Sequence, residues 1–144
     1  MTRIVVVNRT RGTVLGERIR MTDDLFGRMR GFLFRREPVE GEGLLLSPCK
    51  AVHMIGMRFA LDVVFIDEKG TVVAVHPDLR PWRWTPVHRH AMHALELPAG
   101  TILRTETRTG DALSWTPEGT ASEELERPPP ARTEETTLRT RRPA

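Results

Sequence analysis

Reactive and polar side chains are concentrated in residues 49–67, next to an apolar run that is typical of a buried strand. In chain order they are Cys49, His53, Met57, Arg58 and Asp62. A polar group inside a fold costs roughly several kcal/mol unless it is hydrogen-bonded or paired. These side chains therefore belong either to a buried structural network or to a binding site.

Cys49 and His53 lie four residues apart, so in a helix they would share one face. On such a face they could act as metal ligands or as a thiolate–imidazole pair. Alternatively, Cys49 is a small buried apolar residue, and His53 is a hydrogen-bonded residue at the edge of the core with no functional role. Because two ligands alone make a poor metal site, we assign no metal ligand and no catalytic residue.

Two carboxylates interrupt apolar runs, and each needs a hydrogen-bond donor. For Asp62 the candidate donors are Arg58 and the backbone amides near Gly56, in a structural pair or as an acceptor that lines a pocket. Glu96 repeats the pattern in a second apolar run. If the two carboxylates met, one pKa would rise, and they could serve as an acid/base pair.

A loose His-x-His-x-x-His cluster is formed by His88, His90 and His93. It indicates either two imidazoles on one side of a strand, as in zinc or copper sites, or a solvated loop. His76 precedes a proline at the end of a strand and supports no assignment.

Trp82 and Trp84 share a face if their segment is extended. Beside Arg80 and Arg83, the paired indoles could stack on a sugar or a base. Alternatively, they close the open end of a small core.

Short apolar segments separated by turn signals predict seven strands. They are Ile4–Val7, Thr13–Met21, Leu44–Leu46, Leu61–Ile66, Thr71–Val75, Met92–Leu97 and Ala112–Trp115. Residues 67–70 predict a hairpin loop between the fourth and fifth segments.

One helix is predicted to begin at Thr22, which can cap it, with apolar residues at helical spacing up to Leu33. The fold class expected is α+β and mostly β. We expect a small, antiparallel-rich, barrel-like sheet with one main helix near the N-terminus.

At 144 residues the chain fits one domain, residues 1–117, followed by a disordered tail, residues 118–144, that is rich in Pro, Arg and Glu. The net charge is only +3, and no basic stripe appears, so nucleic-acid binding is not expected. The single cysteine excludes an internal disulfide. No signal peptide or membrane-spanning run is apparent, which predicts a cytoplasmic protein.

The motif order also carries a resemblance. It runs through Gly43–Leu46, Cys49, Val52-His53-Met54, Gly56-Met57-Arg58, Leu61–Asp67, Gly70–Val73, Leu95–Gly100 and Gly110-Asp111. Over residues 5–116 this order resembles the DUF192 family. The resemblance implies a compact, mostly β domain with a helix near its start, and it implies no particular activity.

Three functional hypotheses follow. The first is a non-catalytic β domain that binds a small molecule or a protein partner, with a polar pocket formed by Cys49, His53, Met57, Arg58, Asp62 and Glu96. The second is a metal- or thiol-dependent enzyme that uses an accessible Cys49 with His53. The third is an accessory or assembly module whose tail binds a protein partner. The nucleophile-elbow, Walker, dinucleotide-binding and Cys-x-x-Cys motifs are absent from the sequence, and no cofactor is indicated.

Overall fold

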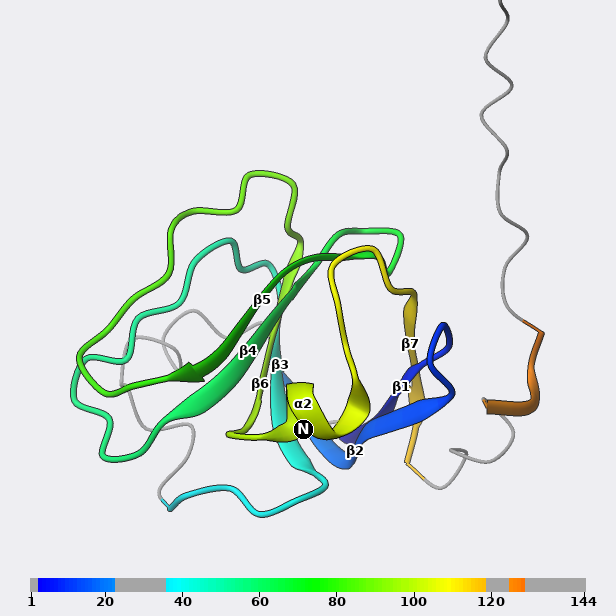
Figure 1. Ribbon diagram of the computed structural model, residues 1–144, viewed down its shortest axis with the longest axis horizontal. Helices are drawn as coiled ribbons and strands as arrows, with labels where there is room; N and C mark the ends of the chain where they lie inside the picture. The colour runs from blue at the N-terminus through cyan, green and yellow to red at the C-terminus, as the bar shows by residue number, and fades with distance from the viewer. Residues whose placement is uncertain (1–2, 23–35, 119–124, 129–144) are drawn as a thin grey trace, which may run out of the picture.

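The computed structural model describes residues 3–22, 36–118 and 125–128. Within them, seven strands form one sheet in the order β5-β4-β6-β3-β2-β1-β7 (Figure 1). The strands are β1 (Arg3–Asn8), β2 (Thr13–Thr22), β3 (Glu42–Leu46), β4 (Leu61–Ile66), β5 (Val72–Leu79), β6 (His93–Pro98) and β7 (Leu113–Pro117). The prediction of seven short strands is confirmed, and Leu61–Ile66 is confirmed to the residue.

The sheet is mostly antiparallel, with one parallel pair between β2 and β3. It curls until its two outer strands meet at one end. There, Thr71 bridges Ala112, the N–H of Val72 donates to the carbonyl of Asp111, and the N–H of Leu113 donates to the carbonyl of Gly70. The expected barrel-like sheet is therefore present.

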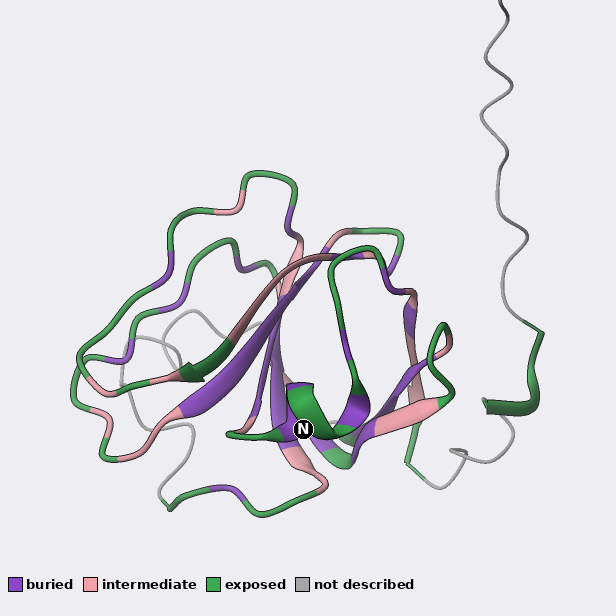
Figure 2. Ribbon diagram, viewed as in Figure 1, coloured by how far each residue is buried: buried purple, intermediate pink, exposed green. Residues whose placement is uncertain are grey.

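Two hydrophobic clusters lie on the two faces of this sheet. The inner cluster includes Leu15, Ile19, Val64 and Leu95. The outer cluster includes Val63 and residues from the segment that follows β3. Side chains alternate between the faces of a strand, so β4 must be apolar on both, which explains its continuous apolar run. The central strands are buried along most of their length (Figure 2).

The helix whose bounds the structure describes is α2 (Thr101–Thr105). It does not lie near the N-terminus, so the predicted position of the main helix is wrong. The segment predicted to be helical after Thr22, residues 23–33, lies outside the described residues. The sequence did not indicate α2 because it is short and the N–H of its second residue, Ile102, is bound by a distant side chain, as shown below.

Strand β5 extends to Leu79, beyond the predicted end at Val75, although it contains Pro77. Proline is tolerated there because β5 is an edge strand, where one side of the backbone needs no partner. The division into a domain of residues 1–117 and a tail remains a prediction. No helix in the described part of the chain is long and apolar enough to cross a membrane.

Candidate functional site

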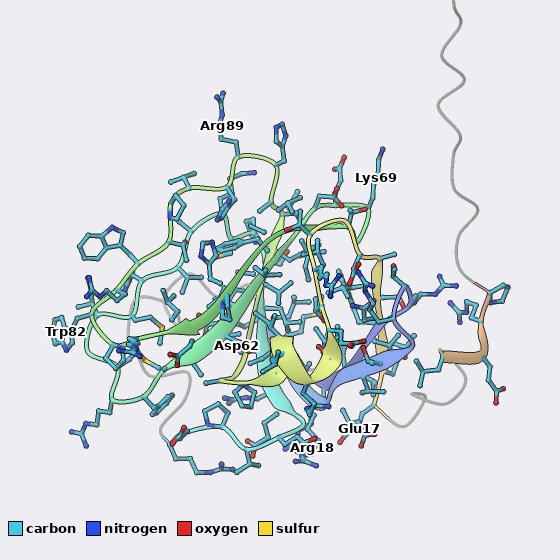
Figure 3. The ribbon with its side chains drawn as sticks, viewed as in Figure 1. Glu17, Arg18, Asp62, Lys69, Trp82 and Arg89 are labelled. Atoms are coloured by element: carbon cyan, nitrogen blue, oxygen red, sulfur yellow. The ribbon has the colours of Figure 1, made fainter. Side chains whose placement is uncertain are left out.

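Asp62 is fully buried, and both of its carboxylate oxygens accept hydrogen bonds from backbone N–H groups. Oδ1 accepts from Asp78 on β5, and Oδ2 accepts from Ile102 in α2, each at 2.8 Å. Neither bond comes from Arg58 or Gly56, the donors that the sequence suggested. Through these two hydrogen bonds, Asp62 on β4 holds α2 and the end of β5 in place beside β4 (Figure 3).

The strand register separates Asp62 from Glu96. On β6, Asp62 lies opposite Leu97, and Val63 lies opposite Glu96. Directly opposite residues share a face and successive residues alternate, so the two carboxylates point to opposite faces of the sheet. The acid/base pair considered from the sequence is therefore not formed.

Cys49 and His53 lie in different environments. Cys49 is 3% exposed, packs in the outer hydrophobic cluster, and its Sγ donates to the carbonyl of Ala51 at 3.2 Å. His53 is exposed, and its backbone forms an isolated bridge with Trp84 rather than a turn of helix. Its Nδ1 accepts a long hydrogen bond, 3.4 Å, from the N–H of Ile55.

This burial gives a direct prediction for the thiol. In the native protein, we expect Cys49 to react with an aromatic disulfide reagent far more slowly than in the denatured protein, because the reagent must reach a shielded sulfur. Absorbance after mixing, with and without denaturant, measures both rates. Equal rates would show that the sulfur is accessible and would restore the thiol-enzyme hypothesis.

Met57 and Arg58 complete the predicted set on this segment. Met57 is half-buried and packs against the outer cluster, whereas Arg58 is exposed. The predicted residues therefore comprise a buried structural part, Cys49 and Asp62, and a surface part, His53 and Arg58. The structure does not gather them around one cavity.

The closest contact between histidines joins His76 and His88, a pair that the sequence did not indicate. Their Nε2 atoms are 2.8 Å apart. Burial lowers the pKa of both imidazoles, and repulsion by His88 lowers that of His76 further. His93 instead contacts Ser47, and the described residues hold no group of three or more potential metal ligands. The predicted cluster of three histidines is therefore not formed.

Two loops, residues 49–60 and 80–91, lie side by side and are joined by backbone hydrogen bonds (Figure 1). Met54 donates to Arg83 at 2.7 Å, Trp82 donates to Met54 at 2.8 Å, and Thr85 donates to Val52 at 2.9 Å. The side chain of Thr85 also accepts from the N–H of Val52. The paired loops cover the outer face of the sheet and are fixed to each other.

The outer surface of these loops is apolar and basic. Trp82 and Trp84 are 63% and 71% exposed, and Ile55 and Val87 are also exposed. Trp82 has a φ of 65°, a left-handed conformation that bulky residues rarely adopt. Its side chain projects away from the body of the protein (Figure 3). The tryptophans therefore do not close the core, which was one of the two interpretations of the sequence.

Neither loop contains an aspartate or a glutamate, whereas together they hold five lysine or arginine residues: Lys50, Arg58, Arg80, Arg83 and Arg89. Lys50 donates to the carbonyls of Arg89 and Ala91, and Arg80 pairs with Asp78. The Arg58 and Arg83 side chains lie on the same loops as the tryptophans and are exposed.

Asp111 is a third buried carboxylate, after Asp62 and Glu96, and the sequence did not indicate it as a site residue. It accepts hydrogen bonds from Asn8 Nδ2 at 2.9 Å, from the N–H of Arg108 at 3.0 Å, and from two nitrogens of Arg11 at 3.1 and 3.2 Å. Burial alone would raise the pKa of Asp111. The bonds from Arg11, Asn8 and Arg108 outweigh burial and hold it below its ordinary value.

An open cavity of about 290 Å³ lies between the β4–β5 hairpin and the loop that precedes β6. It is lined by Lys50, Asp67, Glu68, Lys69, His90, Ala91 and Met92. The Asp67 carboxylate already accepts hydrogen bonds from the backbone N–H groups of Lys69 and Thr71. Of this lining, only Lys50 and Asp67 lie in the segment from which the site was predicted, and neither was a predicted site residue.

Comparison with known proteins places this architecture in a family. The DUF192 family model, described as "Uncharacterized ACR", matches residues 6–115. A UPF0127 protein of Pyrococcus furiosus is 30% identical over 113 residues, covering 76% of this chain and 97% of the relative. A UPF0127 protein of Thermococcus sibiricus is 29% identical over 116 residues, covering 77% of this chain and 74% of the relative.

Among solved structures, a chain from Sinorhizobium meliloti has a TM-score of 0.67 at 24% identity. The alignment covers 79% of this chain and 92% of that one, whose label proposes a transcription regulator. At this identity the likeness shows the fold alone. From the family-model match over residues 6–115 and the match to the Pyrococcus furiosus relative, the chain belongs to the DUF192 family.

Proposed function

We propose that this protein is a non-catalytic binding domain that recognises an acidic segment of a protein partner. The proposed site is the surface formed by His53, Ile55, Arg58, Trp82, Arg83, Trp84 and Val87, called the tryptophan surface below. The observation that carries the proposal is the exposure of two indoles on loops whose backbones are held by hydrogen bonds. Exposed aromatic side chains on a fixed scaffold are typical anchors of interfaces.

The charge of the tryptophan surface sets the chemistry of the partner. Because the two loops carry basic side chains and no carboxylate, an acidic segment would be attracted and a basic one repelled. Arginine is also common among the residues that anchor protein interfaces, because its guanidinium group can bind a carboxylate through two hydrogen bonds.

The aliphatic side chains favour a protein over a nucleic acid. Ile55 and Val87 present exposed branched aliphatic side chains. A nucleic-acid base cannot stack on such side chains, whereas a Leu or Phe side chain of a protein partner packs well against them. We therefore expect the segment to combine Asp or Glu with large apolar residues. Asp62 and Glu96 are left out of the proposed site, because both are buried.

The test uses short synthetic peptides that combine Glu with Leu and Phe, and basic peptides of the same apolar content. We expect the acidic peptides to bind, and the double variant Trp82→Ala/Trp84→Ala to lose at least about tenfold in affinity, as hot-spot residues do. Tryptophan fluorescence of the wild type and calorimetry of both proteins measure binding. Leu103→Ala, which removes an exposed apolar side chain from α2, is the matched control and should bind normally.

Two outcomes would overturn the proposal. One is equal binding of acidic and basic peptides, which would remove the role of charge. The other is tighter binding of a single-stranded oligonucleotide than of any peptide, which would identify a nucleic-acid site instead. Both tryptophan substitutions should leave the free energy of unfolding nearly unchanged, because the side chains are exposed.

A further inference from the structure

The His76–His88 pair joins a strand to a loop through side chains alone. His76 lies on β5, and His88 lies in the loop of residues 80–91. The two Nε2 atoms are 2.8 Å apart, and both rings are partly buried. At that distance one Nε2–H donates to the other Nε2, so two metal-ligating nitrogens converge on one point.

The backbone around both rings is fixed. On β5, His76 pairs with Val63 of β4. The N–H of His88 donates to the carbonyl of Lys50 at 2.8 Å, and its carbonyl accepts from the N–H of Ala91 at 3.1 Å. Both imidazoles also pack against the buried ring of Phe65, with centroids 5.7 and 4.5 Å away. The rings are therefore held in place before any ligand binds, which lowers the entropic cost of binding.

The protonation state of the pair suits a metal. Only a neutral imidazole nitrogen without a proton can ligate, and burial lowers the pKa of both rings. The donor of the pair needs only to move its proton from Nε2 to Nδ1, so ligation requires no net loss of a proton.

We propose that His76 and His88 form a two-histidine site for a divalent transition-metal ion of the Cu²⁺, Ni²⁺ or Zn²⁺ class. Imidazole nitrogens bind such ions at about 2.0–2.1 Å, so tetrahedral ligation separates two nitrogens by about 3.3 Å. The pair needs to open by only about half an ångström to admit the ion. Two protein ligands alone hold an ion weakly, so water or an outside ligand must complete the coordination at this pair, whose rings are already held in place. The hard ion Mg²⁺ should not bind.

The experiment uses tag-free, full-length protein. Equilibrium dialysis against CuCl₂, NiCl₂ or ZnCl₂, with metal content read by mass spectrometry, should give one ion per chain, and MgCl₂ should give none. His76→Ala and His88→Ala should each weaken binding at least about tenfold. His90→Ala removes an exposed imidazole elsewhere on the paired loops and should bind metal as the wild type does.

Nitrogen-15 spectra of the wild type keep the test independent of the folding of any variant. Addition of zinc should shift the Nε2 resonances of two histidines and leave the other three unchanged. The absence of any bound ion in the wild type, or equal binding by the His76→Ala/His88→Ala double variant, would overturn the proposal. Peptide binding at the tryptophan surface is a separate readout, so either proposal can fail alone.

Discussion

Replacement of Asp62 by alanine is expected to lower the free energy of unfolding by about 4 kcal/mol. Its carboxylate is the acceptor for the N–H groups of Asp78 and Ile102. A buried donor left without an acceptor costs about 1–3 kcal/mol; the N–H of Ile102 is buried, and that of Asp78 is partly buried. A domain of this size is stable by only about 5–15 kcal/mol, so the variant should be largely destabilised. Urea denaturation followed by circular dichroism measures the loss.

Two further variants sharpen this result. Asp62→Asn keeps one acceptor oxygen and should lose about half as much stability. Glu17→Ala removes an exposed carboxylate from β2 and should change stability by at most about 0.5 kcal/mol. A stable Asp62→Ala protein would show that the carboxylate is not needed for the fold. It would then return Asp62 to the list of pocket residues, as the sequence allowed.

Replacement of Asp111 by alanine is expected to cost about 3 kcal/mol at neutral pH. The substitution removes one of the two acceptors of the fully buried Asn8 amide, the other being Thr107 Oγ1, and it removes the acceptor of the backbone N–H of Arg108. The Asn8 amide is then left in a place that water reaches poorly, whereas the N–H of Arg108 is only partly buried, and a buried donor without a partner is costly. Denaturant midpoints for the wild type and the variant measure the difference.

The same carboxylate makes stability depend on pH. The folded protein holds the pKa of Asp111 below its ordinary value of 3.8, so the unfolded chain takes up the proton first as the pH falls. The stabilisation is fully present above that ordinary value and is lost as the pH falls through the lowered pKa. As the pH falls from neutral to below 3.8, the wild type should therefore lose more stability than Asp111→Ala does.

A surface ion pair supplies the control for Asp111. Glu40 pairs with Arg104 at 3.3 Å, but both side chains are largely exposed. Glu40→Gln should cost at most about 1 kcal/mol, because water screens such pairs. Equal acid sensitivity of the wild type and Asp111→Ala would show that other carboxylates control the acid transition.

The parts of the fold that were predicted correctly have local causes. Strand β4 was located to the residue because both of its faces are buried, so apolar residues fill it without a break. The hairpin that follows was indicated by a turn sequence whose Asp67 side chain accepts two backbone N–H groups. In both segments the residues that define the element lie within it.

The parts that were missed depend on partners far along the chain. Helix α2 begins at Thr101 after a glycine that offers no side-chain cap, and Asp62, about forty residues earlier, binds its Ile102 N–H. The spacing of Cys49 and His53 suggested a helical face, but His53 pairs with Trp84 instead. His76 on β5 meets His88 only because the loop of residues 80–91 folds back against the sheet. No local pattern carries such information.

The meeting of the two ends of the sheet has a consequence for protein synthesis. Strand β1 pairs with β7, so Ile4 faces Pro117, and Asn8 binds Asp111. These partners are separated by more than a hundred residues, and such distant pairings form slowly. While the ribosome is still producing β7, the edge of β1 that pairs with β7 has no neighbour, and the two ends of the curled sheet cannot meet. We therefore expect this domain to complete its folding only after Pro117 has left the exit tunnel, and to need protection from aggregation until then.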